Sequence, residues 1–335
     1  MNSFGRIFRV SIFGESHGQA IGVVIDGCPA GIGLGGDDFA EDLARRRGGG
    51  PGATTRREID APLIQSGVFE GKTTGSPIAV LFENHDIRSE DYDRLRHVPR
   101  PGHADFAAHR RYGGFRDHRG GGHFSGRLTA ALVAAGVVAK KLIPPIRIRA
   151  WLEQAGGRRD IEEAIRETAG QGDSIGGLIA CQAENMPIGL GEPFFDSLES
   201  LVSHAMFAIP GIKAVEFGAG FKAAEMRGSE FNDAFADASG RTKTNHAGGI
   251  NGGLSNGNNL SFRVAMRPPS SIRKPQRSFD IRTGQEAELS IDGRHDACIA
   301  MRAPVIVEAA TAIVLADLLL VERALRPSAE QESVG

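Results

Sequence analysis

A polar loop near the start of the chain carries side chains that suit acid–base or nucleophilic chemistry. Glu15, Ser16 and His17 lie between Gly14 and Gly18, and an alternating apolar run typical of a strand stands on each side. Glycines let the backbone approach a ligand closely, and histidine transfers protons near neutral pH. The pattern predicts either a reactive loop at the tip of two strands or a tight turn whose Ser and His cap backbone groups.

Residues 14–18 also satisfy the G-x-S-x-G pattern of serine hydrolases. In those enzymes the serine follows a strand and directly precedes a helix. Here a second strand is predicted at 21–27, which disfavours Ser16 as a nucleophile. A serine hydrolase stays an alternative, and labelling of Ser16 by a fluorophosphonate would support it. A G-x-G-x-x-G pattern at 31–36 lies in a proline–glycine turn and lacks the later acidic residue of dinucleotide-binding domains.

Arginine and glycine are concentrated in loops at 45–52, 100–103 and 119–127. Arginine binds carboxylate and phosphate oxygens in pairs, and glycine exposes backbone N–H groups to them. These loops predict a pocket for a small polyanion. Two later segments add to it, because 245–257 is too rich in glycine for a regular element and 267–272 ends a strand with a cation and two hydroxyls.

The composition argues against nucleic acid or membrane as a partner. The 335 residues include 39 basic and 41 acidic ones, so the formal net charge is −2. An RNA-binding protein that uses the Arg/Gly loops is a second alternative, but aromatic residues are sparse and the charge is near zero. Three widely separated cysteines indicate a reduced protein without structural zinc, and no signal peptide is recognisable, so we expect a cytoplasmic protein without a bound metal.

The second half of the chain echoes the first. Segments at 21–33 and 175–191 are similar, and the predicted strands at 76–82 and 260–266 correspond. Each half closes with a long apolar helix, at 125–143 and about 297–323, and the second contains charges that argue against a membrane span. Helices that are apolar on nearly every side must be covered on both faces.

This pattern predicts an α+β fold, a sheet–helix–sheet sandwich with an internal pseudo-duplication. We expect one domain over residues 1–335, with similar halves at about 1–145 and 170–325. The tail at about 326–335 is expected to be disordered.

Taken in order, the motifs resemble those of the chorismate synthase family over roughly residues 4 to 325. The motifs that carry the resemblance are Gly14-Glu15-Ser16-His17-Gly18, Phe69-Glu70-Gly71-Lys72-Thr73-Thr74-Gly75, Arg100-Pro101-Gly102-His103-Ala104-Asp105, Arg119-Gly120-Gly121-Gly122, Asn245-His246-Ala247-Gly248-Gly249-Ile250 and Gly293-Arg294-His295-Asp296.

The resemblance implies a lyase of the shikimate pathway to the aromatic amino acids. It would convert 5-enolpyruvylshikimate 3-phosphate to chorismate and phosphate by an anti-1,4-elimination, with reduced FMN as cofactor although no net redox change occurs. It also implies a homotetramer with a sheet–helix–sheet core, and an external flavin reductase or other supply of reduced flavin.

The resemblance also implies roles for individual residues. His17 matches the general acid toward the departing phosphate, His103 matches the residue that protonates the reduced flavin, and Asp296 matches the acid that assists proton removal. The implied substrate-binding residues are Ser16, Arg46, Arg100 and Arg127. The implied FMN-binding residues are His123, Phe124, Ser125, Asn251, Gly252, Arg267, Pro268, Pro269, Ser270, Ser271 and Arg294.

The chain departs from the family pattern at several positions. His123 and Phe124 replace Arg and Ser of many members, which affects the expected side-chain contacts to FMN. Gly52 replaces an arginine, which removes one contact to an anion or a nicotinamide nucleotide and favours an enzyme without its own flavin reductase. Pro269 replaces a threonine and Ala297 a proline. None of these changes removes His17, His103 or Asp296, so we expect an active enzyme.

Overall fold

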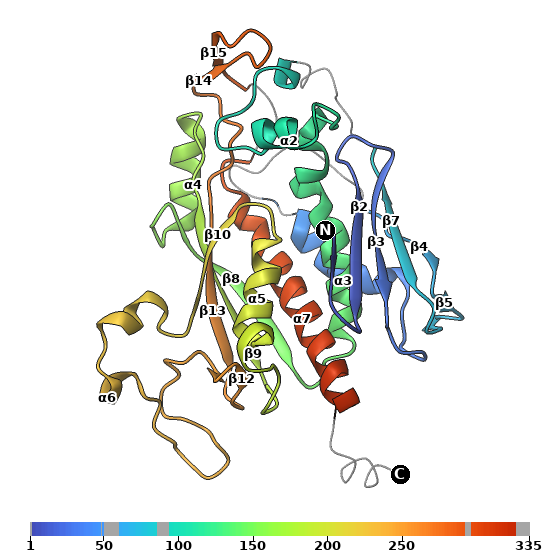
Figure 1. Ribbon diagram of the computed structural model, residues 1–335, viewed down its shortest axis with the longest axis vertical. Helices are drawn as coiled ribbons and strands as arrows, with labels where there is room; N and C mark the ends of the chain where they lie inside the picture. The colour runs from blue at the N-terminus through green and yellow to red at the C-terminus, as the bar shows by residue number, and fades with distance from the viewer. Residues whose placement is uncertain (1, 48, 50–59, 86–93, 292–295, 326–335) are drawn as a thin grey trace.

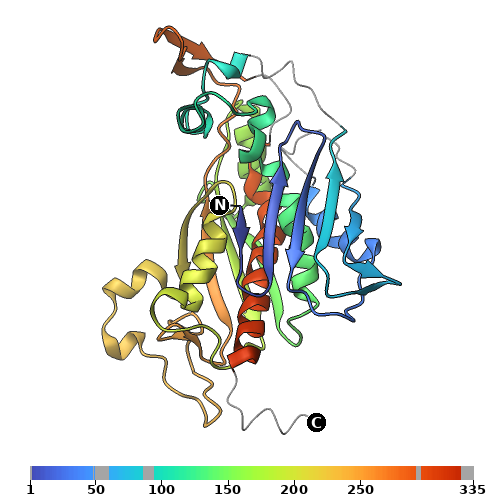
Figure 2. The same cartoon turned by 45° about the vertical axis from the view of Figure 1, so that its right-hand side comes forward.

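The computed structural model describes residues 2–47, 49, 60–85, 94–291 and 296–325 (Figure 1). Gly52, Arg294 and the tail at 326–335 lie outside these ranges. Two antiparallel sheets enclose the long helices α3 (Thr129–Lys140) and α7 (Ala303–Leu325). Helix α3 packs on the first sheet, α7 packs on the second, and the two helices pack on each other. In both views α7 runs between the sheets (Figures 1 and 2), so the expected sheet–helix–sheet sandwich is confirmed.

The two sheets have the same strand order. The first sheet has the order β1-β2-β3-β7-β4, with β1 (Ser3–Phe4), β2 (Arg9–Gly14), β3 (Ala20–Asp26), β7 (Ile78–Glu83) and β4 (Leu63–Ser66). The second has the order β10-β13-β9-β8, with β10 (Ile212–Phe217), β13 (Leu260–Met266), β9 (Gly177–Glu184) and β8 (Arg147–Ala155). Numbered from the first long strand of each half, both sheets follow the order first, second, fourth, third.

The helices also occupy corresponding places in the two halves. Helix α1 (Ala40–Arg47) and helix α5 (Leu198–Phe207) each follow the second long strand of their half, and α3 and α7 each follow the fourth. Helix α4 (Ile161–Gly170) lies between β8 and β9, where the first half has only a loop. This shared order is the internal repeat expected from the sequence; its division at about 1–145 and 170–325 stays a prediction.

Shorter elements connect this frame. The further strands of the described chain are β5 (Val68–Phe69), β6 (Lys72–Thr73), β11 (Ile250–Asn251), β12 (Leu254–Ser255), β14 (Gln276–Phe279) and β15 (Glu286–Leu289). The further helices are α2 (Asp105–Arg111) and α6 (Gly228–Phe231), and the 3₁₀ turns are η1 (Gly36–Phe39), η3 (Arg94–Arg96), η4 (Arg119–Phe124), η5 (Gly126–Leu128), η6 (Phe194–Asp196), η7 (Gly220–Glu225) and η8 (Ile299–Arg302). The two long helices begin later than expected because η5 and η8 precede them.

Strand alternation and apolar helix surfaces build one core. Along β13, Leu260, Phe262, Val264 and Met266 are buried while the residues between them are partly exposed, which is the two-residue period of a strand. Helix α7 belongs to a stretch, Ile299–Leu325, that is long and apolar enough to cross a membrane, but most of it is buried inside the fold. It is therefore a core helix, as its charges indicated.

The two central helices approach each other closely at one glycine. A Cβ atom on Gly136 of α3 would lie 2.3 Å from Cβ of Ala309 on α7. Such a separation is far below van der Waals contact, so only glycine fits at this crossing without moving α7.

A buried ionic cluster joins both helices to α1 and β8. Glu308 of α7 is 3% exposed and accepts hydrogen bonds from both terminal nitrogens of Arg45 at 2.7 Å. Lys140 Nζ lies 3.1 Å and the Ala150 N–H nitrogen 3.0 Å from the same carboxylate. Burial raises the pKa of Glu308, but the Arg45 hydrogen bonds and the charge of Lys140 outweigh burial and lower the pKa below 4.5.

We expect Glu308→Ala to lower the free energy of unfolding by about 3 kcal/mol at pH 7, the lower end for breaking a buried ion pair, because Arg45 and Lys140 keep partial contact with water. A carboxylate with a lowered folded-state pKa stabilises above its unfolded pKa and loses this effect as the pH falls. The difference in free energy of unfolding between the unsubstituted protein and Glu308→Ala should therefore become smaller below about pH 4.5. Urea unfolding at pH 7 and pH 4 measures both, with the exposed Glu162→Gln as control; an equal loss at both pH values would contradict the ionic origin.

Candidate active site

The loop that carries Ser16 and His17 joins β2 to β3 and is fixed by Asn84. The Asn84 side-chain NH₂ donates to the Glu15 and Gly18 carbonyls, with nitrogen–oxygen distances of 3.1 and 2.9 Å. Both Ser16 and His17 are buried. Because β3 follows the loop directly, the helix that a serine hydrolase needs after its nucleophile is missing at this place. The hydrolase alternative is therefore not supported.

A glycine loop covers Ser16 and reaches both candidate histidines. Gly120 and Gly121 adopt φ values of +58° and +87°, which favour glycine. A Cβ on Gly120 would lie 2.4 Å from His17 Cδ2 and 2.8 Å from Ser16 Oγ, whereas a Cβ on Gly121 would lie 3.3 Å from His103 Cε1. Consecutive glycines thus contact the two imidazoles and bring His17 and His103 to one place. The Ser16 hydroxyl is buried there and makes no hydrogen bond to the described residues.

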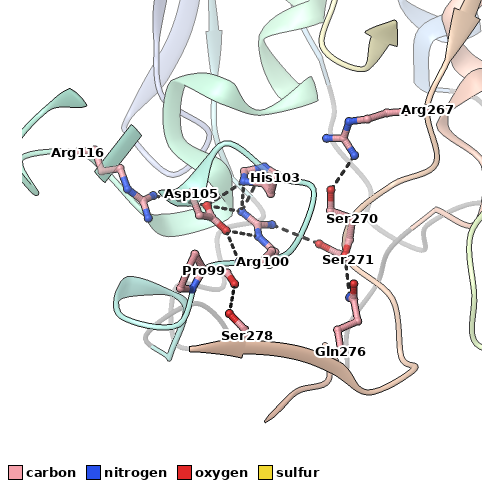
Figure 3. A network of polar contacts seen from close by, with 10 residues as sticks. All are labelled: Pro99, Arg100, His103, Asp105, Arg116, Arg267, Ser270, Ser271, Gln276 and Ser278. Atoms are coloured by element: carbon pink, nitrogen blue, oxygen red, sulfur yellow. Dashed lines mark hydrogen bonds and ion pairs between the residues drawn. The ribbon is translucent and has the colours of Figure 1, made fainter. Parts of the chain in front are cut away.

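His103 belongs to a polar network with Arg100 and Asp105 (Figure 3). Its Nδ1 lies 2.8 Å from Asp105 Oδ1, and Arg100 donates to the same carboxylate through Nε at 2.7 Å and Nη2 at 3.0 Å. Burial lowers the His103 pKa below 6.5 and the Arg100 charge adds to this, while Asp105 acts in the opposite direction. Burial raises the pKa of Asp105, but hydrogen bonds from His103 and Arg100 outweigh it and hold that pKa well below its usual range.

The second half of the chain adds a cation and two hydroxyls to this network. Arg100 Nη1 donates to Ser271 Oγ at 3.3 Å, and Arg267 Nη1 donates to Ser270 Oγ at 2.7 Å (Figure 3). Burial and the nearby charge of Arg100 lower the pKa of Arg267. Within the described chain, the hydrogen bonds of Arg267 go to Ser270 and to the Pro268 carbonyl and not to a carboxylate. A half-buried guanidinium that bonds a hydroxyl and is repelled by a second cation is a fitting place for a phosphate.

Arg46 and Arg127 are joined by Asp60. Arg46 Nη1 lies 3.1 Å from one carboxylate oxygen of Asp60, and Arg127 Nη1 pairs with the other. All three side chains are buried, and together they carry a net charge of +1. Arg127 Nε also donates to Asn84 Oδ1 at 3.0 Å, which connects this cluster to the loop of Ser16 and His17. Asn84 therefore links Arg46 and Arg127 to the loop that carries Ser16 and His17.

Asp296 lies at the same end of the second sheet as Arg267. It is buried and pairs with Arg302. The next residue, Ala297, accepts a hydrogen bond at 2.9 Å from the N–H of Ile175. Gly176, the residue after Ile175, packs against the segment that follows β13, since a Cβ atom added to it would lie 3.3 Å from Pro268 Cδ. The segment that carries Asp296 thus lies beside the segment that carries Arg267, and the charge of Arg267 acts on His103.

The other FMN-binding candidates are divided. His123 Nδ1 lies 2.8 Å from the Gly14 carbonyl and Nε2 lies 3.2 Å from Asn2 Oδ1, so both ring nitrogens bind within the chain. Ser125 Oγ accepts from the Arg127 N–H and caps η5, and the Phe124 ring is 39% exposed.

Asn251 ends β11 and Gly252 begins the turn to β12. This hairpin adjoins the start of β13, whereas Arg267 follows the end of β13. Within the described single chain, Asn251 and Gly252 lie away from the network of His103. Their role in FMN binding stays a prediction.

Several residues of the network had no role assigned from sequence. Asp105 stood inside the motif that starts at Arg100, so its place was recognisable. Asn84 directly follows β7, and the pairing of β7 with β3 sets it beside the loop of His17, so the strand pattern contained a signal. The sequence contained no such signal for Asp60, because its contacts with Arg46 and Arg127 depend on tertiary packing alone.

Comparisons with known proteins agree with this geometry. The family model described as chorismate synthase matches residues 8–320. A protein of Chitinophaga pinensis named chorismate synthase is 57% identical over 324 residues, covering 96% of this chain and 98% of that protein. One of Aeropyrum pernix with the same name is 46% identical over 97% of this chain and 94% of its own length.

Among solved structures, one described as a crystal structure of chorismate synthase superposes with a TM-score of 0.73 and 28% identity. The match covers 95% of this chain and 93% of that one.

Proposed function

The chain belongs to the chorismate synthase family, lyases of aromatic amino acid biosynthesis, and from this premise we propose how its own residues carry out the reaction. The substrate is 5-enolpyruvylshikimate 3-phosphate, and the products are chorismate and phosphate. The observation that carries the assignment of the site is the contact of Gly120 with His17 and of Gly121 with His103. Two proton-transfer groups then lie together, and arginines of both halves, Arg100 and Arg267, act on His103.

The substrate carries a phosphate and two carboxylates, and the network offers cations to bind them. Arg46 and Arg127 share one carboxylate, so they keep a net positive charge toward an anion. The buried hydroxyl of Ser16, on the loop that also carries His17, adds a polar group to the site. We assign Ser16, Arg46, Arg100 and Arg127 to substrate binding, with Arg100 acting also through its contact with the His103 ring and its hydrogen bond to Ser271.

Proton transfer is divided among three side chains. His17, buried under Gly120, donates a proton to the phosphate oxygen that leaves. His103 has its Nδ1 bound to Asp105, so Nε2 is the ring nitrogen that transfers the proton. Asp296, paired with Arg302, assists removal of the proton from the ring of the substrate. General acid–base groups in fixed positions typically accelerate a reaction by about 10²–10⁴-fold.

The residues at 267–271 fit the phosphate of FMN, because Arg267 bonds the Ser270 hydroxyl and, in the described chain, no carboxylate, while the Ser271 hydroxyl accepts from Arg100. When bound, reduced flavin supplies electron density transiently to the eliminating substrate. We further propose a cytoplasmic homotetramer that receives reduced flavin from an external reductase. Gly52 in place of the family's arginine supports the last point.

An oxygen-free assay tests the function. Purified protein with dithionite-reduced FMN and 5-enolpyruvylshikimate 3-phosphate should release chorismate and phosphate in equal amounts. Reaction with oxidised FMN and no reductant should give neither product. Absence of chorismate in the reduced assay would overturn the assignment.

The source of reduced flavin is tested separately. NADPH with oxidised FMN should not support turnover by the purified protein until a flavin reductase is added. Oxidation of NADPH coupled to chorismate release without that addition would show that the protein reduces flavin itself.

We expect Arg46→Gln to raise KM for the substrate by about 10–100-fold, since a hydrogen bond to a charged group contributes roughly 1.5–3 kcal/mol. The kcat should change less, because Arg46 binds the anion and does not transfer a proton. Steady-state kinetics in the oxygen-free assay separate the two parameters, with the exposed Arg158→Gln as control. A fall in kcat with KM unchanged would assign Arg46 a different role.

A further inference from the structure

The carboxylate of Asp105 is enclosed by nitrogen donors. It is 1% exposed and lies 2.8 Å from His103 Nδ1. Arg100 donates to it through the backbone N–H at 3.1 Å, through Nε at 2.7 Å and through Nη2 at 3.0 Å. Arg116 Nη1 lies 3.6 Å away. Because these donors occupy both of its oxygens, any effect of Asp105 on the reaction must pass through its neighbours.

These contacts define the state of the His103 ring. The ionised carboxylate of Asp105 can only accept a hydrogen bond, so the Nδ1 atom of His103 that faces it carries a proton. Nε2 is then the ring nitrogen that is left to transfer a proton. Arg100 Nη2 lies 3.0 Å from Nδ1 and 3.3 Å from Nε2, and such similar distances place it across the ring and not in line with either lone pair. A Cβ on Gly121 would lie 3.4 Å from Nε2, so this nitrogen faces the glycine pair that also contacts His17.

We propose that Asp105 is a positioning residue for His103. It holds the imidazole in the Nδ1–H tautomer with Nε2 directed toward Gly121, and it fixes Arg100, which in turn bonds Ser271 of the second half (Figure 3). A carboxylate that orients a histidine in this way is a common device for tautomer control. The role for the reaction rests on the proposed function, in which His103 transfers a proton.

The groups that face His103 determine the sign of its response to substitution. Arg100 comes from the loop that carries His103, Asp105 begins α2, and Arg267 acts on His103 from the end of β13. Asp105 is the anion among these groups and favours the imidazolium, whereas both arginines oppose it. Asp105→Asn should therefore lower the His103 pKa further, decrease the protonated fraction at pH 7 and move the activity optimum to lower pH.

The chain offers a matched control. Asp280 accepts from Arg282 through the same three donors, namely the backbone N–H at 2.8 Å, Nε at 3.2 Å and Nη2 at 2.8 Å. Arg282 is exposed and Asp280 is partly exposed, and the side-chain partner of the Asp280 carboxylate in the described chain is Arg282 and not an imidazole. Asp280→Asn removes a carboxylate from an arginine clamp of the same form without removing a hydrogen bond to an imidazole.

The first test uses the unsubstituted protein without flavin. Nitrogen-15 NMR shifts of His103, assigned by their loss in His103→Ala, report which ring nitrogen is protonated. We expect the Nδ1–H tautomer above the pKa of the ring. Finding the Nε2–H tautomer would overturn the proposal, and this outcome does not depend on any variant folding or on the identity of the reaction.

The second test compares Asp105→Asn, Asp105→Glu and Asp280→Asn. Asp105→Asn should lower kcat at pH 7 by about 10–100-fold, as displacement of a reacting group does, together with a lowered His103 pKa. Asp105→Glu should keep that pKa near its original value, and Asp280→Asn should change neither quantity. An unchanged or raised His103 pKa in Asp105→Asn would contradict the proposal. If no variant and no unsubstituted protein formed chorismate, the proposed function would fail while the NMR result still stood.

Discussion

Replacing His17 by alanine is expected to lower kcat for chorismate formation by about 10²–10⁴-fold, the usual contribution of a positioned general acid. His17 is 4% exposed and lies under Gly120, so water does not readily replace its imidazole as a proton donor. The same change at His103 should fall in the same range. Rates of chorismate release in the oxygen-free assay with reduced FMN measure both effects.

The exposed His85 supplies a control for loss of a histidine. It pairs with Glu83 at 3.3 Å on the surface, and His85→Ala should leave kcat within about twofold because surface changes away from the site have small effects. Nearly unchanged rates in both His17→Ala and His103→Ala would show that the acid–base roles belong to other groups.

Gly120→Ala should lower kcat by roughly 10²-fold although it adds a single methyl group. That methyl would lie 2.4 Å from His17 Cδ2 and 2.6 Å from Nε2, so the imidazole must move. Displacement of a reacting group by about 1 Å costs on the order of 10²-fold in rate. The backbone also has φ of +58°, which costs a residue other than glycine roughly 1–2 kcal/mol. Kinetics and the thermal unfolding temperature together separate the two effects.

Gly71→Ala is the matched control for backbone strain. Gly71 has a φ of +73° in the turn between β5 and β6, and a Cβ there would meet nothing within 4 Å. It should lower the unfolding temperature about as much as Gly120→Ala while kcat stays unchanged. An equal loss of kcat in both variants would mean that strain, and not displacement of His17, causes the effect.

The architecture was accessible from the sequence because it follows from local patterns. Alternating residues predicted the strands on both sides of the loop at 14–18, and two helices apolar on all sides required a sheet on each side. The starts of those helices were placed a few residues early, since the sequence gives little sign that η5 and η8 are 3₁₀ turns. The first residue of each helix depends on how the helix enters the packed core.

The candidate residues were named through motifs, but their partners were not. Asp60 joins Arg46 and Arg127 across 14 and 67 positions of the chain, a contact that no local period encodes. The contacts of Gly120 and Gly121 with different histidines likewise exist only after the loops are packed. Asn251 and Gly252 are the opposite case. The resemblance named them as FMN-binding residues, but in the single chain they lie at the start of β13, away from Arg267 at its end.

The ionic cluster around Glu308 has a consequence beyond stability. Arg45 binds Glu308 in the core, and the next residue of α1, Arg46, lies in the anion-binding network. One short helix therefore links the spacing of α3 and α7 rigidly to the placement of a guanidinium that we assign to the substrate. Substitutions deep between those helices should thus alter substrate affinity from a distance, and epistasis between the interior and the pocket would be the evolutionary signature of this coupling.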